Sequence, residues 1–257
     1  MIVLLSVGSF CVGIIAILIM VFQLFMHRNR KDSSWIMWGV LGSLFAALLA
    51  FTNFAQYNTG MTPAIHTCSR MKFTALLLML HSLMGFTLSF FALRQGPFHA
   101  LAGIFHSALI VLLWSGELVF ENRIISFNFA LMPRPYFGTG FGPLGFALSV
   151  YIMLVGFAGL GVWIACRKRV EDTAHYFIAA FAAWLLFGIH DVFVSVYGAG
   201  YFFFSEYGVL CFAIAILVAT LRESLNALRL KNEAEAESRA KTEVIAGVSH
   251  DFRTPLN

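Results

Sequence analysis

Seven long apolar runs constrain this chain more than any other feature of its sequence. Each is close to the roughly 20 residues that an α-helix needs to cross about 30 Å of hydrocarbon. Because the bilayer core offers no water, each run must satisfy its own backbone hydrogen bonds as a helix. The sequence therefore predicts an all-α fold, a bundle of seven transmembrane helices. The runs lie at approximately 2–26, 35–56, 71–93, 98–120, 144–166, 173–197 and 201–221.

The composition excludes an ordinary soluble domain. Hydrophobic residues make up 60% of the chain and charged residues only 12%, whereas soluble domains carry roughly 25% charged residues. The net charge of +4 is small and gives no reason to expect a nucleic-acid partner. The four cysteines show no CxxC spacing, so neither a metal site nor a disulfide framework is expected. We expect the first run to be a retained helix, because it has no basic segment or cleavage site of a signal peptide.

Basic residues predict the direction of the helices. HRNRK (27–31) follows the first run, Arg94 follows the third, and RKR (167–169) follows the fifth. By the positive-inside rule these loops are cytoplasmic, together with the charged C-terminal tail. We therefore expect the N-terminus outside and the C-terminus in the cytoplasm. The opposite loops are expected to carry some positive charge as well, at Arg70, Lys72, Arg123 and Arg134.

Polar residues inside the runs are candidates for a binding site, because such residues are costly in a membrane. A group at similar depth in the outer half predicts an outward-facing pocket for a small amphipathic or lipid-like signal. The alternative is hydrogen bonding that only holds the helices together. His81 and His106 lie deeper and predict a separate inner contact. The ligand-binding candidates are Asn53, Glu117, His190, Asp191 and Glu206. No pair of ligands at i,i+4 spacing supports direct metal binding.

The longest of the expected outer loops, 121–143, has the sequence ENRIISFNFALMPRPYFGTGFGP. It contains aromatic residues, two prolines before Gly138 and three glycines. One interpretation is a lid folded back over the bundle. The other is an interfacial connector anchored by its aromatic side chains.

A charged segment follows the seventh run. Residues 222–243 contain ten charged residues in 22 and neither glycine nor proline. The pattern predicts an exposed helix that continues the seventh run, either as one strand of a dimeric connector or free-standing. Opposite charges recur at i,i+4 in the pairs Arg229–Glu233, Lys231–Glu235, Glu235–Arg239, Glu237–Lys241 and Arg239–Glu243.

The last residues, VSHDFRTPLN, resemble the H-box of sensor histidine kinases of the HisKA type. The matching positions are His250, Asp251, Phe252, Arg253, Thr254, Pro255 and Leu256, with Asn257 after them. The resemblance implies that His250 accepts phosphate and that Asp251 is its acid–base partner. It also implies that Thr254 orients water when the partner regulator is dephosphorylated. Pro255 removes the helical hydrogen bond to the carbonyl of Asp251 and predicts a bend there.

The membrane part is similar to the seven-helix N-terminal regions of sensor histidine kinases. The stretches that carry this likeness are NFAQYN (53–58), YFGTGFGPLGF (136–146) and GIHDVFVSVYGAGYFFFSEYG (188–208). Together the two resemblances imply a sensor kinase of a two-component system in the bacterial inner membrane. They imply a homodimer that passes phosphate from His250 to a cytoplasmic response regulator.

The expected organisation is a sensor domain at 1–221, a helical linker at 222–243, and the start of a dimerisation and phosphoacceptor domain at 244–257. The resemblance implies that ATP and Mg²⁺ bind to a further C-terminal domain, so these 257 residues hold no cofactor and are expected to be inactive alone. A retinal-based light sensor is excluded, because 201–221 contains no lysine for a Schiff base. A membrane transporter or membrane enzyme with an incidental regulatory tail remains the alternative, although no clear inverted repeat supports transport.

Overall fold

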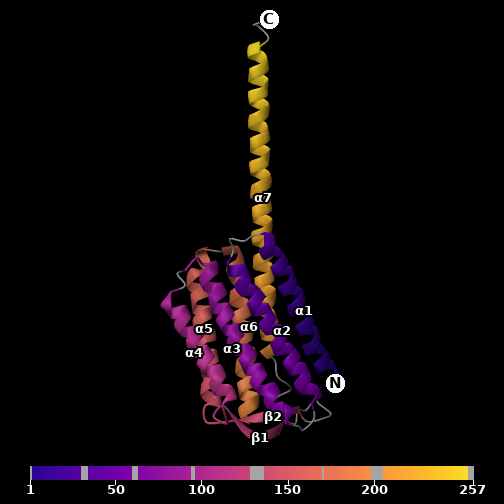
Figure 1. Ribbon diagram of the computed structural model, residues 1–257, viewed down its shortest axis with the longest axis vertical. Coiled ribbons are helices and arrows are strands. Elements are labelled where there is room, and N and C mark those ends of the chain that lie inside the picture. The colour runs from indigo at the N-terminus through magenta and orange to yellow at the C-terminus, as the bar shows by residue number, and fades with distance from the viewer. Residues whose placement is uncertain are drawn as a thin grey trace. The chain divides into compact units, whose positions relative to one another are not determined.

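The computed structural model describes residues 2–29, 34–59, 63–93, 96–127, 136–169, 171–197 and 205–253. Figure 1 shows a bundle of long helices with a β-hairpin across one end. Seven of the described helices are long and apolar enough to cross a membrane, which confirms the predicted number of spans. The elements are α1 (Ile2–Asn29), α2 (Ser34–Asn58), α3 (Ala64–Phe90), α4 (Pro97–Trp114), β1 (Phe120–Phe127), β2 (Tyr136–Phe141), α5 (Gly145–Cys166), the 3₁₀ turn η1 (Arg167–Arg169), α6 (Glu171–Tyr197) and α7 (Ser205–Arg253).

Two helix boundaries differ from the prediction. Helix α3 begins at Ala64 rather than near residue 71, directly after Pro63, and proline is well suited to the start of a helix. The predicted boundary was wrong because it was placed where the apolar run begins. Lys72, next to that boundary, was therefore counted with the charges of the outer loop. Helix α4 ends at Trp114 rather than near residue 120. Leu118 and Val119 then lie in the connection, and strand β1 begins at Phe120.

The hairpin corrects the expectation of an all-α fold. Strands β1 and β2 pair antiparallel, with Ile124 opposite Thr139 and Phe127 opposite Tyr136. Aromatic and β-branched residues favour a strand, and β1 contains two phenylalanines and two isoleucines. The register is irregular between Phe120 and Ile124. The segment expected as a loop is therefore a paired element over its described residues.

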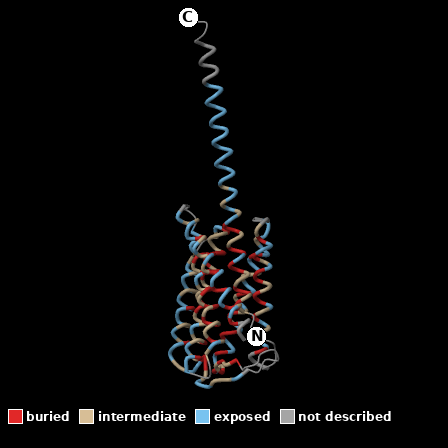
Figure 2. Tube along the Cα trace, turned by 90° about the vertical axis from the view of Figure 1, so that its right-hand side faces the viewer, coloured by how far each residue is buried: buried red, intermediate tan, exposed pale blue. Residues whose placement is uncertain are grey.

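The core lies along the inner faces of the helices, and the outer faces are exposed and apolar. Figure 2 shows buried residues on the inside of the bundle and exposed residues on its outside. Trp163 and Phe177 stack in the core with ring centroids 4.0 Å apart. Large apolar side chains of α4, such as Phe98 and Ile104, are instead exposed. Apolar side chains on the outside are what a bundle in contact with lipid requires.

Two glycines on α5 provide a test of this packing. A Cβ atom on Gly156 would overlap the Trp184 ring and lie 2.9 Å from Leu185, whereas one on Gly161 meets no heavy atom within 4 Å. We expect Gly156→Ala to lower the free energy of unfolding by about 1–3 kcal/mol, because the core is already filled there. Gly161→Ala should raise it by up to about 1 kcal/mol, because alanine suits a helix better. Thermal unfolding in detergent compares the two, and equal shifts would contradict the packing.

Residues Val218–Asn257 form a second unit. The backbone of α7 is helical through 222–243, as predicted, and every side chain from Leu228 to Ile245 is exposed. Arg239 pairs with Glu235 and not with Glu243. The charge pairs present are Arg229–Glu233 at 2.8 Å, Lys231–Glu235 at 3.8 Å, Glu235–Arg239 at 4.0 Å and Glu237–Lys241 at 2.6 Å. Four of the predicted pairs are therefore confirmed.

Candidate functional site

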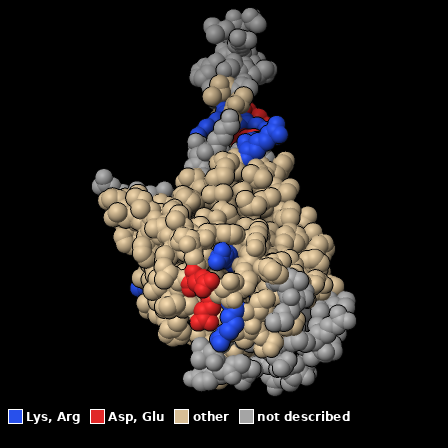
Figure 3. Space-filling model, turned by 60° about the horizontal axis from the view of Figure 1, so that its bottom comes forward, with Lys and Arg blue, Asp and Glu red and all other residues tan. Residues whose placement is uncertain are grey.

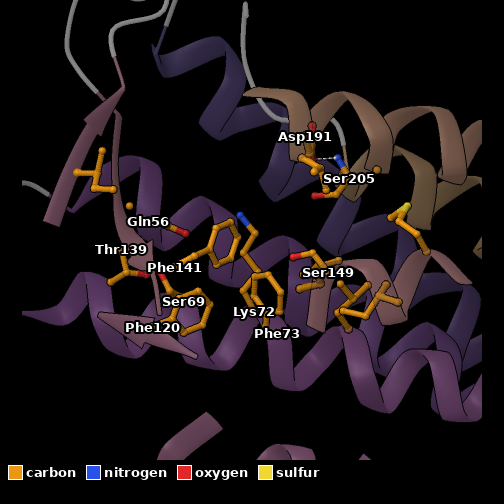
Figure 4. A pocket seen from close by; sticks show the side chains of 18 of the residues that line it. Gln56, Ser69, Lys72, Phe73, Phe120, Thr139, Phe141, Ser149, Asp191 and Ser205 are labelled. Atoms are coloured by element: carbon orange, nitrogen blue, oxygen red, sulfur yellow. Dashed lines mark hydrogen bonds between the residues drawn. The ribbon is translucent and has the colours of Figure 1, made fainter. Parts of the chain in front are cut away.

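A cavity of about 150 Å³ lies beneath the hairpin. Figure 4 shows its side chains, which come from helices on several sides and from both strands. Most of them are apolar, including Phe73, Phe120, Phe141, Ile152 and Trp184. The polar ones are Gln56, Ser69, Lys72, Tyr136, Thr139, Ser149, Asp191 and Ser205. Small, mostly apolar cavities with a few convergent polar groups are typical ligand sites.

The hairpin is fixed over this cavity at both ends. Gln56 Nε2 of α2 donates a hydrogen bond to the Phe137 carbonyl of β2 at 3.0 Å. The Phe73 ring of α3 packs edge-on against Phe120, with centroids 5.1 Å apart. At the base, the Gly142 N–H bonds the Val119 carbonyl at 2.8 Å. For its described residues the segment thus agrees with the first interpretation, a cover folded back over the bundle.

The cavity wall carries one basic and one acidic side chain. Lys72 of α3 and Asp191 of α6 both line it, and they interact electrostatically. In Figure 4 the Lys72 amino group points away from its helix toward the side where Asp191 and Ser205 lie. Asp191 Oδ2 accepts a hydrogen bond from the Ser205 N–H at 2.8 Å. This bond ties α6 to the first turn of α7.

A second acidic group, Glu206, lies at the start of α7 and is only 1% exposed. Its Oε1 accepts a hydrogen bond from Ser9 Oγ of α1, and its Oε2 accepts one from Asn53 Nδ2 of α2, both at 2.7 Å. It also interacts electrostatically with Lys72. A buried carboxylate needs such donors because burial removes its hydration. Three helices are therefore joined at one carboxylate.

Two buried polar atoms of the cavity residues have no hydrogen-bond partner within the described part of the chain. They are Gln56 Oε1 and Thr139 Oγ1, and both residues line the cavity. Buried polar atoms in folded proteins are rarely left without a partner. The cavity also contains the Tyr136 phenol. Burial raises the pKa of this phenol well above its ordinary value, and the Glu206 and Asp191 carboxylates raise it further. Its hydroxyl therefore stays neutral.

The structure brings together four of the five predicted binding residues. Asp191 lines the cavity, His190 Nδ1 lies 3.2 Å from Asp191 Oδ1, and Asn53 bonds Glu206. Glu117 lies apart from this group and does not line the cavity. Because α4 ends at Trp114, Glu117 lies in the connection to β1, where it is exposed. Figure 3 shows a few charged side chains on the end of the bundle that is turned forward.

Sequence reasoning missed the cation of the cavity. Lys72 was counted with the charges of the outer loop, although Ser69, Lys72, Phe73 and Leu76 all line the cavity. Their spacing of i, i+3, i+4 and i+7 places them on one face of α3. That spacing was a usable signal once the start of the helix was set at Ala64. Gln56 and Thr139 carried no comparable signal, because their role depends on the hairpin.

The inner contact predicted for His81 and His106 is present and includes a third histidine. The His81 ring stacks on His99 with centroids 4.5 Å apart and meets His106 at 5.5 Å. His106 Nε2 lies 2.7 Å from the Tyr151 hydroxyl. Among the described residues no group of histidine, cysteine or acidic side chains is arranged to hold a metal ion.

The predicted phosphoacceptor segment is described only in part. His250 and Asp251 belong to α7, whose backbone is helical to Arg253, but their side chains lie outside the description. Thr254 and Pro255 lie outside the described residues altogether. The role of Thr254 and the bend at Pro255 therefore stay predictions.

Fold and site together define a multi-pass membrane protein with a small, mostly apolar cavity at one end of a helical bundle. No protein-family model matches the chain, and no curated protein matches it.

Proposed function

We propose that this chain belongs to a bacterial membrane histidine kinase of a two-component system and accepts phosphate on His250. The observation that carries this proposal is the sequence SHDFRTPLN at 249–257, with its resemblance to the H-box. A surface histidine has no need of the acidic, arginine, threonine and proline residues that follow His250 in this order.

The chemistry of the motif fits phosphoryl transfer. A neutral imidazole has one nitrogen that can attack the γ-phosphate of ATP, while the other nitrogen gives up or shares its proton. Asp251 is adjacent and supplies a carboxylate for that proton. ATP and Mg²⁺ belong to the nucleotide-binding domain that the family carries after its H-box. The phosphate then passes from His250 to a response regulator.

The membrane part has the features of a sensor for a small amphipathic signal. Its cavity lies beneath the hairpin, and Asp191 in its wall is bonded to the first turn of α7. The adjacent Glu206 belongs to the same turn and holds α1 and α2. A ligand that alters these bonds changes the start of the helix that contains His250. We propose a homodimer with the N-terminus outside and the C-terminus in the cytoplasm of the bacterial cell.

The test is autophosphorylation of the full-length protein in membrane vesicles with radiolabelled ATP. We expect His250→Gln to abolish the label on the protein, because glutamine cannot form the phosphoramidate bond. The matched control is His175→Gln, an exposed histidine of α6, which should leave labelling unchanged. Undiminished labelling of the His250→Gln variant would contradict the proposed function.

A further inference from the structure

The charges in the cavity wall are balanced. Of the residues that line it, Lys72 is the basic one and Asp191 the acidic one. They come from different helices, α3 and α6, so the wall offers a positive group on one side and a negative group on another. Two carboxylates near the cavity, those of Asp191 and Glu206, act electrostatically on Lys72. A lone anion would therefore meet a cation that is already compensated, and a lone cation would meet the Lys72 ammonium.

The polar atoms of Gln56 and Thr139 in the cavity wall can bind an occupant that has both hydrogen-bond donors and acceptors. Gln56 is buried and donates through Nε2 to the Phe137 carbonyl, whereas its Oε1 accepts no hydrogen bond from the described residues. This oxygen needs a donor. The Thr139 hydroxyl is also buried and has no partner in the described parts of the chain, and it can donate to an oxyanion. An ammonium carries three donors, so Lys72 can bind an oxyanion and keep a protein partner.

Size and apolar surface limit the remainder of the occupant. The cavity measures about 150 Å³, and an engineered protein cavity of about 150 Å³ holds one benzene molecule. The side chains between the polar groups include Phe73, Phe141 and Ile152. They suit a short aliphatic chain and exclude a long acyl tail. A wholly apolar occupant would leave the polar atoms of Gln56 and Thr139 unsatisfied.

We propose that this cavity binds a small zwitterionic α-amino acid with an aliphatic side chain. Its carboxylate faces Lys72 and Thr139, its ammonium group faces Gln56 Oε1 and Asp191, and its side chain lies among the phenylalanines. That this amino acid is the signal rests on the proposed function, whereas its binding does not. Both charges of the ligand are then paired inside the protein, which the burial of charges requires.

The first experiment compares ligands that share one carbon chain and differ in their charged groups. The purified chain in lipid nanodiscs is titrated with L-leucine, 4-methylpentanoate and 3-methylbutylamine, and binding is measured by calorimetry. These probes share a branched carbon chain and carry both charges, only the negative charge, or only the positive charge. We expect saturable binding of leucine, and binding of the other two that is at least about tenfold weaker, because each leaves one buried charge without its partner. Equal binding of the acid or the amine, or no binding of leucine, would overturn the proposal.

The second experiment substitutes the two charged residues that line the cavity. Lys72→Met and Asp191→Asn should each weaken leucine binding by roughly 30-fold or more, in line with the loss of one partner of a buried charge pair. The matched control is Lys168→Met, an exposed lysine in the turn η1, which should bind as the unchanged protein does. Unchanged binding by either cavity variant overturns the assignment. If a cavity variant does not fold, the comparison of probes still decides, because it uses the unchanged chain.

The two proposals fail in different ways. The variant His250→Gln should bind leucine normally, because the phosphoacceptor is not part of the cavity. Leucine binding together with undiminished phosphorylation of this variant would contradict the kinase and keep the amino-acid site. Loss of phosphorylation with no leucine binding would keep the kinase and contradict the site.

Discussion

Replacing Asp251 by asparagine is expected to slow autophosphorylation of His250 by about 100-fold or more in the full-length protein. Asparagine keeps the size and hydrogen-bonding capacity of the side chain but cannot take up a proton. General acid–base catalysis by a positioned carboxylate contributes about 10²–10⁴-fold to a rate, and this contribution is what the substitution removes. The measurement is the initial rate of label incorporation from radiolabelled ATP.

Two further variants make this result specific. Glu243→Gln removes another carboxylate of α7, one that is exposed, and should leave the rate unchanged. Thr254→Ala should also keep autophosphorylation, but it should slow removal of phosphate from the response regulator, because the proposed role of Thr254 is to orient water. If Asp251→Asn labels as fast as the unchanged protein, Asp251 is not the acid–base partner of His250.

The number of spans was predictable because it depends on local composition. A run such as 144–166 has few structures open to it in a membrane, since its backbone must bond to itself. The ends of the spans were harder, because apolar character continues past Trp114 into a strand. Hydropathy does not distinguish a helix from a strand in so short a segment. Strand β1 forms only by pairing with β2, and the two strands are separated in sequence by eight residues that the structure does not describe.

Sequence reasoning could group residues of the candidate site only where their depth in the membrane was enough to bring them together. Asn53, Asp191 and Glu206 were grouped correctly, because each is a polar residue in the same half of its helix. The hydrogen bond from Ser9 to Glu206 spans 197 positions, and no local pattern in the sequence specifies such a pair. Lys72 and Glu117 were each misplaced by a helix boundary that lay several residues away from its predicted position.

Glu206→Leu is expected to lower the free energy of unfolding by about 2–4 kcal/mol, because the donors of Asn53 and Ser9 then lose a buried acceptor. Leucine is similar in volume, so the loss reports the hydrogen bonds more than a cavity. The carboxylate lies where α1, α2 and α7 meet, so the loss should appear as a lower midpoint of thermal unfolding in detergent. Glu117 at the same end of the bundle is exposed, and its replacement by Gln should change stability by no more than about 0.5 kcal/mol.

Glu206→Gln separates the geometry of this network from its charge. The new amide keeps one oxygen to accept the hydrogen bond from Ser9, but its nitrogen faces the donor nitrogen of Asn53. Asn53 Oδ1 has no partner among the described residues, so the Asn53 amide can turn over and accept a hydrogen bond from the new nitrogen. Both contacts then persist as neutral hydrogen bonds, and we expect a loss of only about 1 kcal/mol. A loss as large as that of Glu206→Leu would instead mean that the negative charge itself, acting on Lys72, holds this end of the bundle together.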